Sequence, residues 1–145
     1  MKGHATKILR IYLWVLGASL LLQGSISLIL RIMQISPPAF TLNSINADPL
    51  HATIHIVWGL VMLALLVDAR RRGPRVIALL GLSFGAFYIG LALLGVLIYH
   101  PFGLRLDLGE NLFHFMCGPT TLALSIWAMN EAPEPKPIDG SSSAA

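Results

Sequence analysis

Two short segments of the chain carry ionisable side chains one helical turn apart. His51 and His55 are four positions apart in the first segment, and Glu110 and His114 have the same spacing in the second. Residues at i and i+4 lie on one face of an α-helix. Imidazole and carboxylate groups are ligands for zinc and copper. The four residues are therefore candidate metal ligands.

These segments belong to an internal repeat. His55 and His114 are each followed four positions later by a glycine, Gly59 and Gly118, and then by a long apolar run. A repeat of this kind indicates one supersecondary unit used twice. We expect each glycine to face a neighbouring helix at a point of close approach, because it lacks a side chain.

The histidine pair allows two further interpretations. As packing residues, the imidazoles would hydrogen-bond across the close approach and form a polar clasp between the two repeats. As cofactor ligands, His55 and His114 would hold haem from both sides, or serve as axial ligands to a chlorophyll-like pigment. The sequence contains no Gly-x-Ser-x-Gly, Cys-x-x-Cys or His-Glu-x-x-His motif. A non-enzymatic protein is therefore favoured.

The composition is that of a membrane protein. Of the 145 residues, 55% are hydrophobic and 12% are charged, whereas soluble domains have about 25% charged residues. Uncharged runs occupy residues 11–30, 49–67, 76–104 and 111–130. Each has about the 20 residues that a helix needs to cross the hydrocarbon core of a bilayer. The chain is predicted to be an all-α integral membrane four-helix bundle.

The apolar runs define one transmembrane domain over residues 8–130. Residues 1–7 form a short start, and the polar, proline-rich residues 131–145 are expected to be a disordered tail. The expected helices cover about residues 8–33, 50–68, 75–99 and 110–130.

Charge distribution predicts the orientation. The amino terminus and the 68–75 loop hold seven of the ten lysines and arginines. The positive-inside rule then places both termini and this loop in the cytoplasm. The pI of 9.4 is explained by topology, so no nucleic-acid partner is implied. The repeat becomes two parallel helical hairpins, with the lipid bilayer as their first partner.

Local signals refine this picture. Asp48 is a plausible N-cap for the second helix, since a proline follows it at the first helical position. Pro119 predicts a kink or local unwinding in the fourth helix.

A parallel repeat closes around an axis along the membrane normal. We therefore expect the second and fourth helices to be near neighbours, with His55 and His114 turned into the bundle.

The second copy of the motif reads Asn111-Leu-Phe-His114-Phe-Met-Cys-Gly118, and the first copy has Ala52 in place of the asparagine. This pattern resembles a family of small bacterial four-helix membrane proteins, domain of unknown function 4383, whose members repeat Asn-x-x-His-x-x-x-Gly. The resemblance covers about residues 8–130. It implies the topology above and a bacterial inner-membrane location, and it implies no activity.

Three functions follow from these patterns. The first is a structural or interacting subunit, in a homo-oligomer or larger membrane complex, because Gly81 and Gly85 offer a close-packing face on the third helix. The second is a haem- or pigment-binding redox protein using His55 and His114. The third is a small transporter, which the parallel repeat favours.

Overall fold

The computed structural model describes residues 3–35, 48–98, 103–104, 106 and 108–132, apart from the side chains of residues 70 and 72. These residues form four helices: α1 (His4–Ile32), α2 (Pro49–Arg72), α3 (Pro74–Leu97) and α4 (Leu108–Glu131). The expected tail, most of the 34–49 connection, and Arg105 and Asp107 lie outside the described residues.

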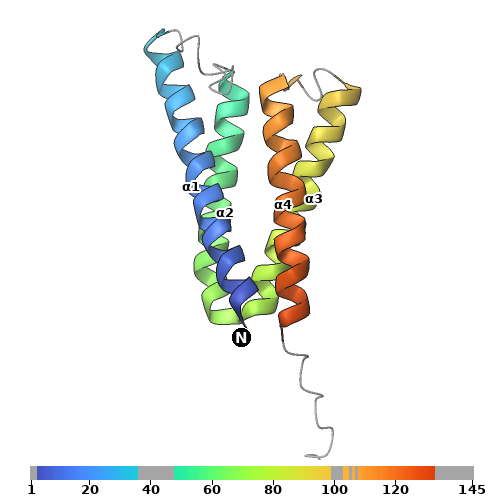
Figure 1. The fold of residues 1–145 in the computed structure, drawn as a ribbon. Helices are drawn as coiled ribbons and strands as arrows, with labels where there is room; N and C mark the ends of the chain where they lie inside the picture. The colour runs from blue at the N-terminus through green and yellow to red at the C-terminus, as the bar shows by residue number, and fades with distance from the viewer. Residues whose placement is uncertain (1–2, 36–47, 99–102, 105, 107, 133–145) are drawn as a thin grey trace, which may run out of the picture.

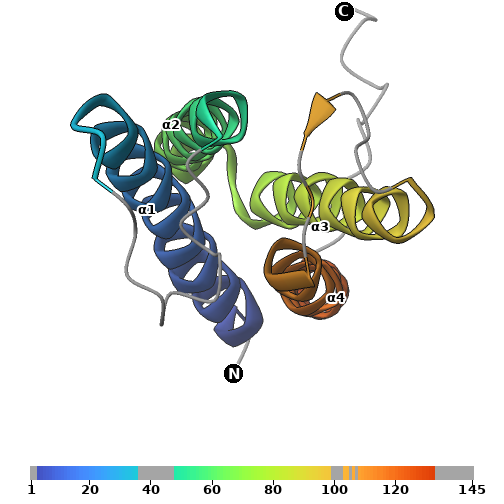
Figure 2. The same ribbon diagram turned by 90° about the horizontal axis from the view of Figure 1, so that it is seen from above.

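The helices alternate in direction (Figure 1). Following the chain, α1 rises from the amino terminus, α2 descends, α3 rises and α4 descends. The most extensive packing is between α1 and α2 and between α3 and α4. Seen from above, these two pairs stand apart as separate units (Figure 2). The bundle therefore consists of two tight helical hairpins in looser contact with each other.

Helix ends follow the local chemistry of the chain. The Asp48 side chain accepts a hydrogen bond of 3.0 Å from the Leu50 N–H at the start of α2, which confirms the predicted N-cap. Gly73 alone separates α2 from α3 and has φ +98°, a conformation that strongly favours glycine. Pro74 then occupies the first position of α3, where its missing N–H costs nothing.

Glycines hold each hairpin together. A Cβ at Gly59 would lie 2.8 Å from the carbonyl oxygen of Gly17 and from the Leu21 nitrogen on α1, and a Cβ at Gly118 would lie 3.0 Å from the Ile89 nitrogen on α3. Both glycines thus face a neighbouring helix, as predicted. The polar-clasp interpretation needs a correction, however. The close approach occurs inside each hairpin and not between the hairpins.

The two hairpins meet through other groups. The Tyr12 hydroxyl on α1 donates to the Cys117 carbonyl on α4 at 3.4 Å, and the Thr121 hydroxyl lies 3.3 Å from the same hydroxyl. At the end of the bundle that carries the amino terminus, the Ala5 N–H donates to Glu131 Oε2 at 3.0 Å. The α1–α4 contact is thus polar at its middle and at this end.

Apolar side chains cover the outside of the bundle. Val15, Leu22, Val57, Leu93 and Leu112 are each more than half exposed. Each helix has the length and composition to cross a membrane. Exposed apolar surface on this scale is unusual for a soluble monomer. The chain is a multi-pass membrane protein, with buried polar groups gathered inside.

Some expectations need adjustment. The first helix begins at His4 rather than near residue 8, and the second extends to Arg72. Of the two outcomes predicted at Pro119, a kink or local unwinding, the unwinding is wrong, because α4 runs through this residue as one helix.

α2 and α4 are the weakest helix pair among the described residues, so their backbones are not the near neighbours expected. Side chains span the space between them. The expected inward orientation of His55 and His114 is confirmed, because both side chains are buried and their ligand atoms lie within 4.8 Å of each other.

Candidate metal centre

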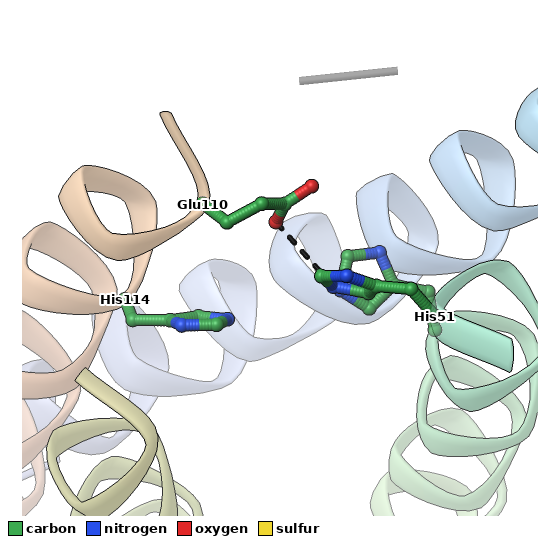
Figure 3. A group of neighbouring side chains, drawn as sticks. His51, Glu110 and His114 are labelled. Atoms are coloured by element: carbon green, nitrogen blue, oxygen red, sulfur yellow. Dashed lines mark hydrogen bonds and ion pairs between the residues drawn. The ribbon is translucent and has the colours of Figure 1, made fainter. Parts of the chain in front are cut away.

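Four side chains from α2 and α4 converge between the hairpins (Figure 3). His51 and His55 come from the first two turns of α2, and Glu110 and His114 come from the first two turns of α4. One ligand atom from each residue lies within 4.8 Å of the others. We call these four residues the His/Glu cluster.

The shortest distances in the cluster involve His51. Its Nε2 atom lies 3.0 Å from Nε2 of His55 and 3.4 Å from Oε2 of Glu110. The two imidazole rings are nearly perpendicular, at 83°. The ring of His114 points from α4 toward the same centre (Figure 3). Donor atoms from both hairpins thus face one small volume.

The cluster is buried. The exposed fractions of His51, His55, Glu110 and His114 are 5%, 5%, 2% and 1%. A cavity of about 20 Å³ adjoins His51, His55 and His114, which is room for one water-sized sphere. A carboxylate this deeply buried needs compensation for its lost hydration. Imidazole neighbours supply part of it, and a cation would supply more.

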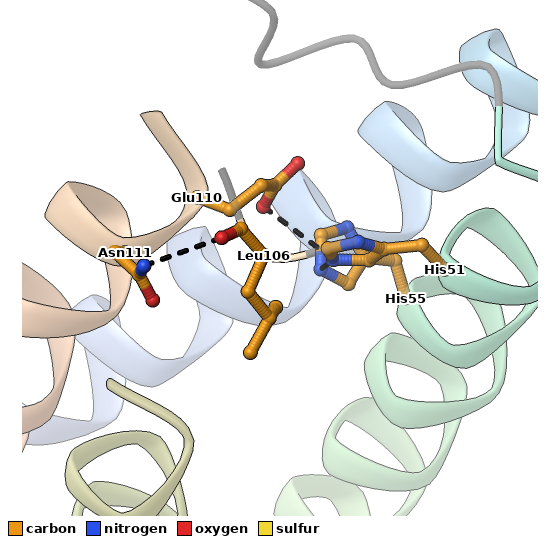
Figure 4. A network of polar contacts seen from close by, with 5 residues as sticks. All are labelled: His51, His55, Leu106, Glu110 and Asn111. Atoms are coloured by element: carbon orange, nitrogen blue, oxygen red, sulfur yellow. Dashed lines mark hydrogen bonds and ion pairs between the residues drawn. The ribbon is translucent and has the colours of Figure 1, made fainter. Parts of the chain in front are cut away.

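A short loop segment covers the cluster (Figure 4). The buried side chains of Leu104 and Leu106 line the cavity. The Asn111 side-chain amide donates to the Leu106 carbonyl oxygen at 3.3 Å. This hydrogen bond ties the loop before α4 to the first turn of α4, and the leucines then separate the polar cluster from its surroundings.

Aromatic rings form the opposite wall. Tyr88 stands edge-on to His114, with ring centroids 5.1 Å apart, and stacks on Phe84 at 4.6 Å. Trp58 stacks on Phe84 in turn, at 5.6 Å. These residues link α2 and α3 directly beneath the cluster. An apolar shell of this kind excludes water and lowers the local dielectric constant around polar groups.

The geometry suits a small metal ion. In a tetrahedral zinc site with bonds of about 2.0–2.1 Å, neighbouring ligand atoms are about 3.3 Å apart. The distances from His51 to His55 and to Glu110 bracket this value. The Nδ1 atom of His114 is buried and has no hydrogen-bond partner among the described residues. Three imidazoles and one carboxylate are a donor set for zinc and related ions.

The predicted site residues fall into three groups. His51, His55, Glu110 and His114 come together in the cluster. Asn111 secures the loop above it. Gly59 and Gly118 lie deeper, inside their hairpins, and do not contribute to the cavity.

Sequence reasoning missed the walls of the site. Tyr88, Leu104 and Leu106 line the cavity, yet as single apolar or aromatic residues they carry no motif. The repeat contained one relevant difference. Asn111 stands where the first copy has Ala52, and its polar side chain needs a hydrogen-bond partner that alanine does not.

Comparison with known proteins adds no identification, since no family model, curated protein or solved structure matches the chain.

Proposed function

We propose that this multi-pass membrane protein binds one first-row divalent metal ion, best represented by zinc, between its two hairpins. The observation that carries the proposal is the convergence of four buried side chains, His51, His55, Glu110 and His114, whose ligand atoms lie within 4.8 Å of one another. The three histidines also line a cavity of about 20 Å³. Two ligands come from each hairpin, so the ion would join α2 to α4, which have little other contact.

A metal ion suits the site better than the haem or pigment interpretation of His55 and His114. A tetrapyrrole is many times larger than the cavity of about 20 Å³. Its ring would also have to displace Tyr88 and the leucine cover. A single ion needs only small movements of the four side chains.

The proposed role is structural. Structural zinc sites have four protein ligands, whereas catalytic sites keep one position open for water or substrate. The His/Glu cluster offers four ligands under an apolar cover. We therefore propose a non-enzymatic protein whose metal stabilises the joined hairpins, consistent with a subunit of a homo-oligomer or larger membrane complex.

The finer topology belongs to the same proposal. We propose that the hairpins are two copies of one unit in the same orientation, which the matched spacing of His55–Gly59 and His114–Gly118 supports. The basic residues favour cytoplasmic termini, and the resemblance to the four-helix family implies a bacterial inner membrane. The metal then lies near the outer surface. The resemblance to the four-helix family supports this arrangement and adds no activity.

The test is metal content after purification in mild detergent with zinc supplied. We expect about one zinc per chain, a thermal stabilisation that a chelator removes, and release of zinc on acidification, because a protonated imidazole cannot ligate. His114→Ala should lower the affinity by at least about 100-fold. His4→Ala is the matched control, since His4 is exposed in the first turn of α1. Equal zinc content in both variants would refute the proposal.

A further inference from the structure

A second feature lies outside the His/Glu cluster, in the contact between α2 and α3. Two adjoining hollows of about 240 Å³ and 340 Å³ share Leu65, Leu80 and Ser83 in their walls. Together they make one groove, which we call the α2/α3 groove. The remaining lining residues are Trp58, Val61, Met62, Phe84, Asp68, Ala69, Val76 and Leu79.

The groove has the length of one membrane leaflet. Along α2 it extends from Trp58 to Asp68, ten residues that correspond to about 15 Å of helix. The hydrocarbon core is about 30 Å thick, so this is about half of it. The stacked rings of Trp58 and Phe84 form its inner end. Its walls are mainly apolar, and Ser83 and Asp68 are the polar side chains that line it.

The chain just beyond the other end of the groove is basic, although the charged residue that lines the groove itself is Asp68. The segment from Asp68 to Arg75 contains four arginines and one aspartate, so its formal charge is positive even with Asp68 beside the groove. Arg71 and Arg75 are exposed on either side of the Gly73 turn, at the bottom of Figure 1. Basic sites between helices at a membrane surface bind anionic lipid headgroups.

We propose that the α2/α3 groove binds an anionic phospholipid, with one acyl chain along the groove and the phosphate at Arg71 and Arg75. The length of the groove, its blocked inner end and the exposed arginines just beyond its open end together favour this occupant. A zwitterionic lipid would fill the groove equally well and gain less at the arginines. The site does not depend on the metal.

The experiment uses the full chain in nonionic detergent with chelator present, so that failure of the metal proposal leaves it unaffected. Dioleoyl phosphatidylglycerol and dioleoyl phosphatidylcholine are added separately. Retained lipid is counted by native mass spectrometry, and the melting temperature is recorded. We expect a preference of about 30-fold for the anionic lipid, at roughly fivefold per arginine.

Two variants separate the headgroup from the chain. Arg71→Gln with Arg75→Gln should remove the preference, whereas Arg31→Gln, an exposed arginine at the opposite end of the bundle, should keep it. Ser83→Leu should block the groove and lower retention of both lipids. Ala86→Leu is the control, because Ala86 is exposed on α3 and does not line the groove.

Several outcomes would overturn the proposal. An unchanged preference in the double arginine variant would show that the headgroup binds elsewhere. Stabilisation by inorganic phosphate equal to that by the lipid would reduce the site to an anion site. A change of oligomeric state in Ser83→Leu without loss of lipid would identify the groove as a packing surface between copies of the chain.

Discussion

The two hairpins are built alike in their interiors. In the first, Gly59 lies against the backbone of Gly17 and Leu21, and in the second, Gly118 lies against the backbone of Ile89. Each contact comes one turn below the histidine of its helix. Close backbone approach at small residues is a common way for membrane helices to associate. The equivalent glycines, Gly59 and Gly118, thus allow the two helices of each hairpin to pack closely.

The hairpins differ one helical turn nearer the start of α2 and α4, at the level of the His/Glu cluster. In the first hairpin, the buried Ala52 packs its carbonyl oxygen against Gly24. In the second, the Asn111 side chain fills the equivalent space beside Gly95 and donates to the Leu106 carbonyl. Among the described residues, this side-chain tie between a helix and the loop that covers the cluster is found in the second hairpin.

The ligands differ in the same region. His51 on α2 and Glu110 on α4 each precede a histidine by one turn. Because one of them is a carboxylate, its ionised form would offset part of the charge of a divalent cation. Two hairpins with similar glycine contacts can therefore supply different ligand types to one metal site.

The largest expected effect comes from disrupting these glycine contacts. Gly59→Ala would place its Cβ 2.8 Å from two backbone atoms, which cannot move without shifting α1. We expect a loss of about 1–3 kcal/mol in stability. Gly118→Ala should cost somewhat less, because the nearest backbone atom to its Cβ, the Ile89 nitrogen, would be 3.0 Å away. Thermal unfolding in detergent measures both.

Gly90→Ala is the control for this pair, since a Cβ there meets nothing within 4 Å. Equal melting temperatures for the Gly59 and Gly90 variants would show that the α1–α2 contact is looser than the structure indicates.

The sequence predicted much of this architecture. Helix number, the Asp48 cap and the packing of Gly59 and Gly118 follow from local rules: hydropathy, N-cap chemistry and the absence of a side chain. The helical spacing also placed each ligand pair on one face. These features depend on residues close together in the chain.

The features that were missed depend on how distant segments meet. α2 and α4 are the weakest helix pair among the described residues, and the histidine and glutamate side chains span the space between them. Leu106 covers the site, and the Asn111 side chain donates a hydrogen bond to its carbonyl oxygen. Neither the interhelical distance nor the path of a loop has a local signature, so the walls of the cavity could not be predicted.

A smaller effect is expected from removing the hydrogen bond that holds the loop of the second hairpin over the His/Glu cluster. Asn111→Ala would leave the Leu106 carbonyl without this donor and loosen the loop above the cluster. Residues that orient a metal site from outside its ligands typically change affinity by 10–100-fold, and we expect about tenfold weaker zinc binding here. Competition with a fluorescent chelator measures the change.

Asn130→Ala provides the control, because Asn130 is exposed near the far end of α4. Zinc affinity in Asn111→Ala equal to that of this control would mean that the loop does not protect the site.

The smallest effect should come from exchanging the two unlike ligands. His51→Glu alone makes the cluster more negative, and Glu110→His alone removes its carboxylate. Each single variant should therefore bind zinc about tenfold more weakly. The double exchange restores three imidazoles and one carboxylate. If the two hairpins are equivalent, the double variant should bind zinc within about threefold of the original chain. The coupling in this double-mutant cycle is then large and favourable, as expected for groups in direct contact. Losses that simply add would instead show that each position demands its own ligand, and the proposed equivalence of the hairpins would fail while the metal site itself could stand.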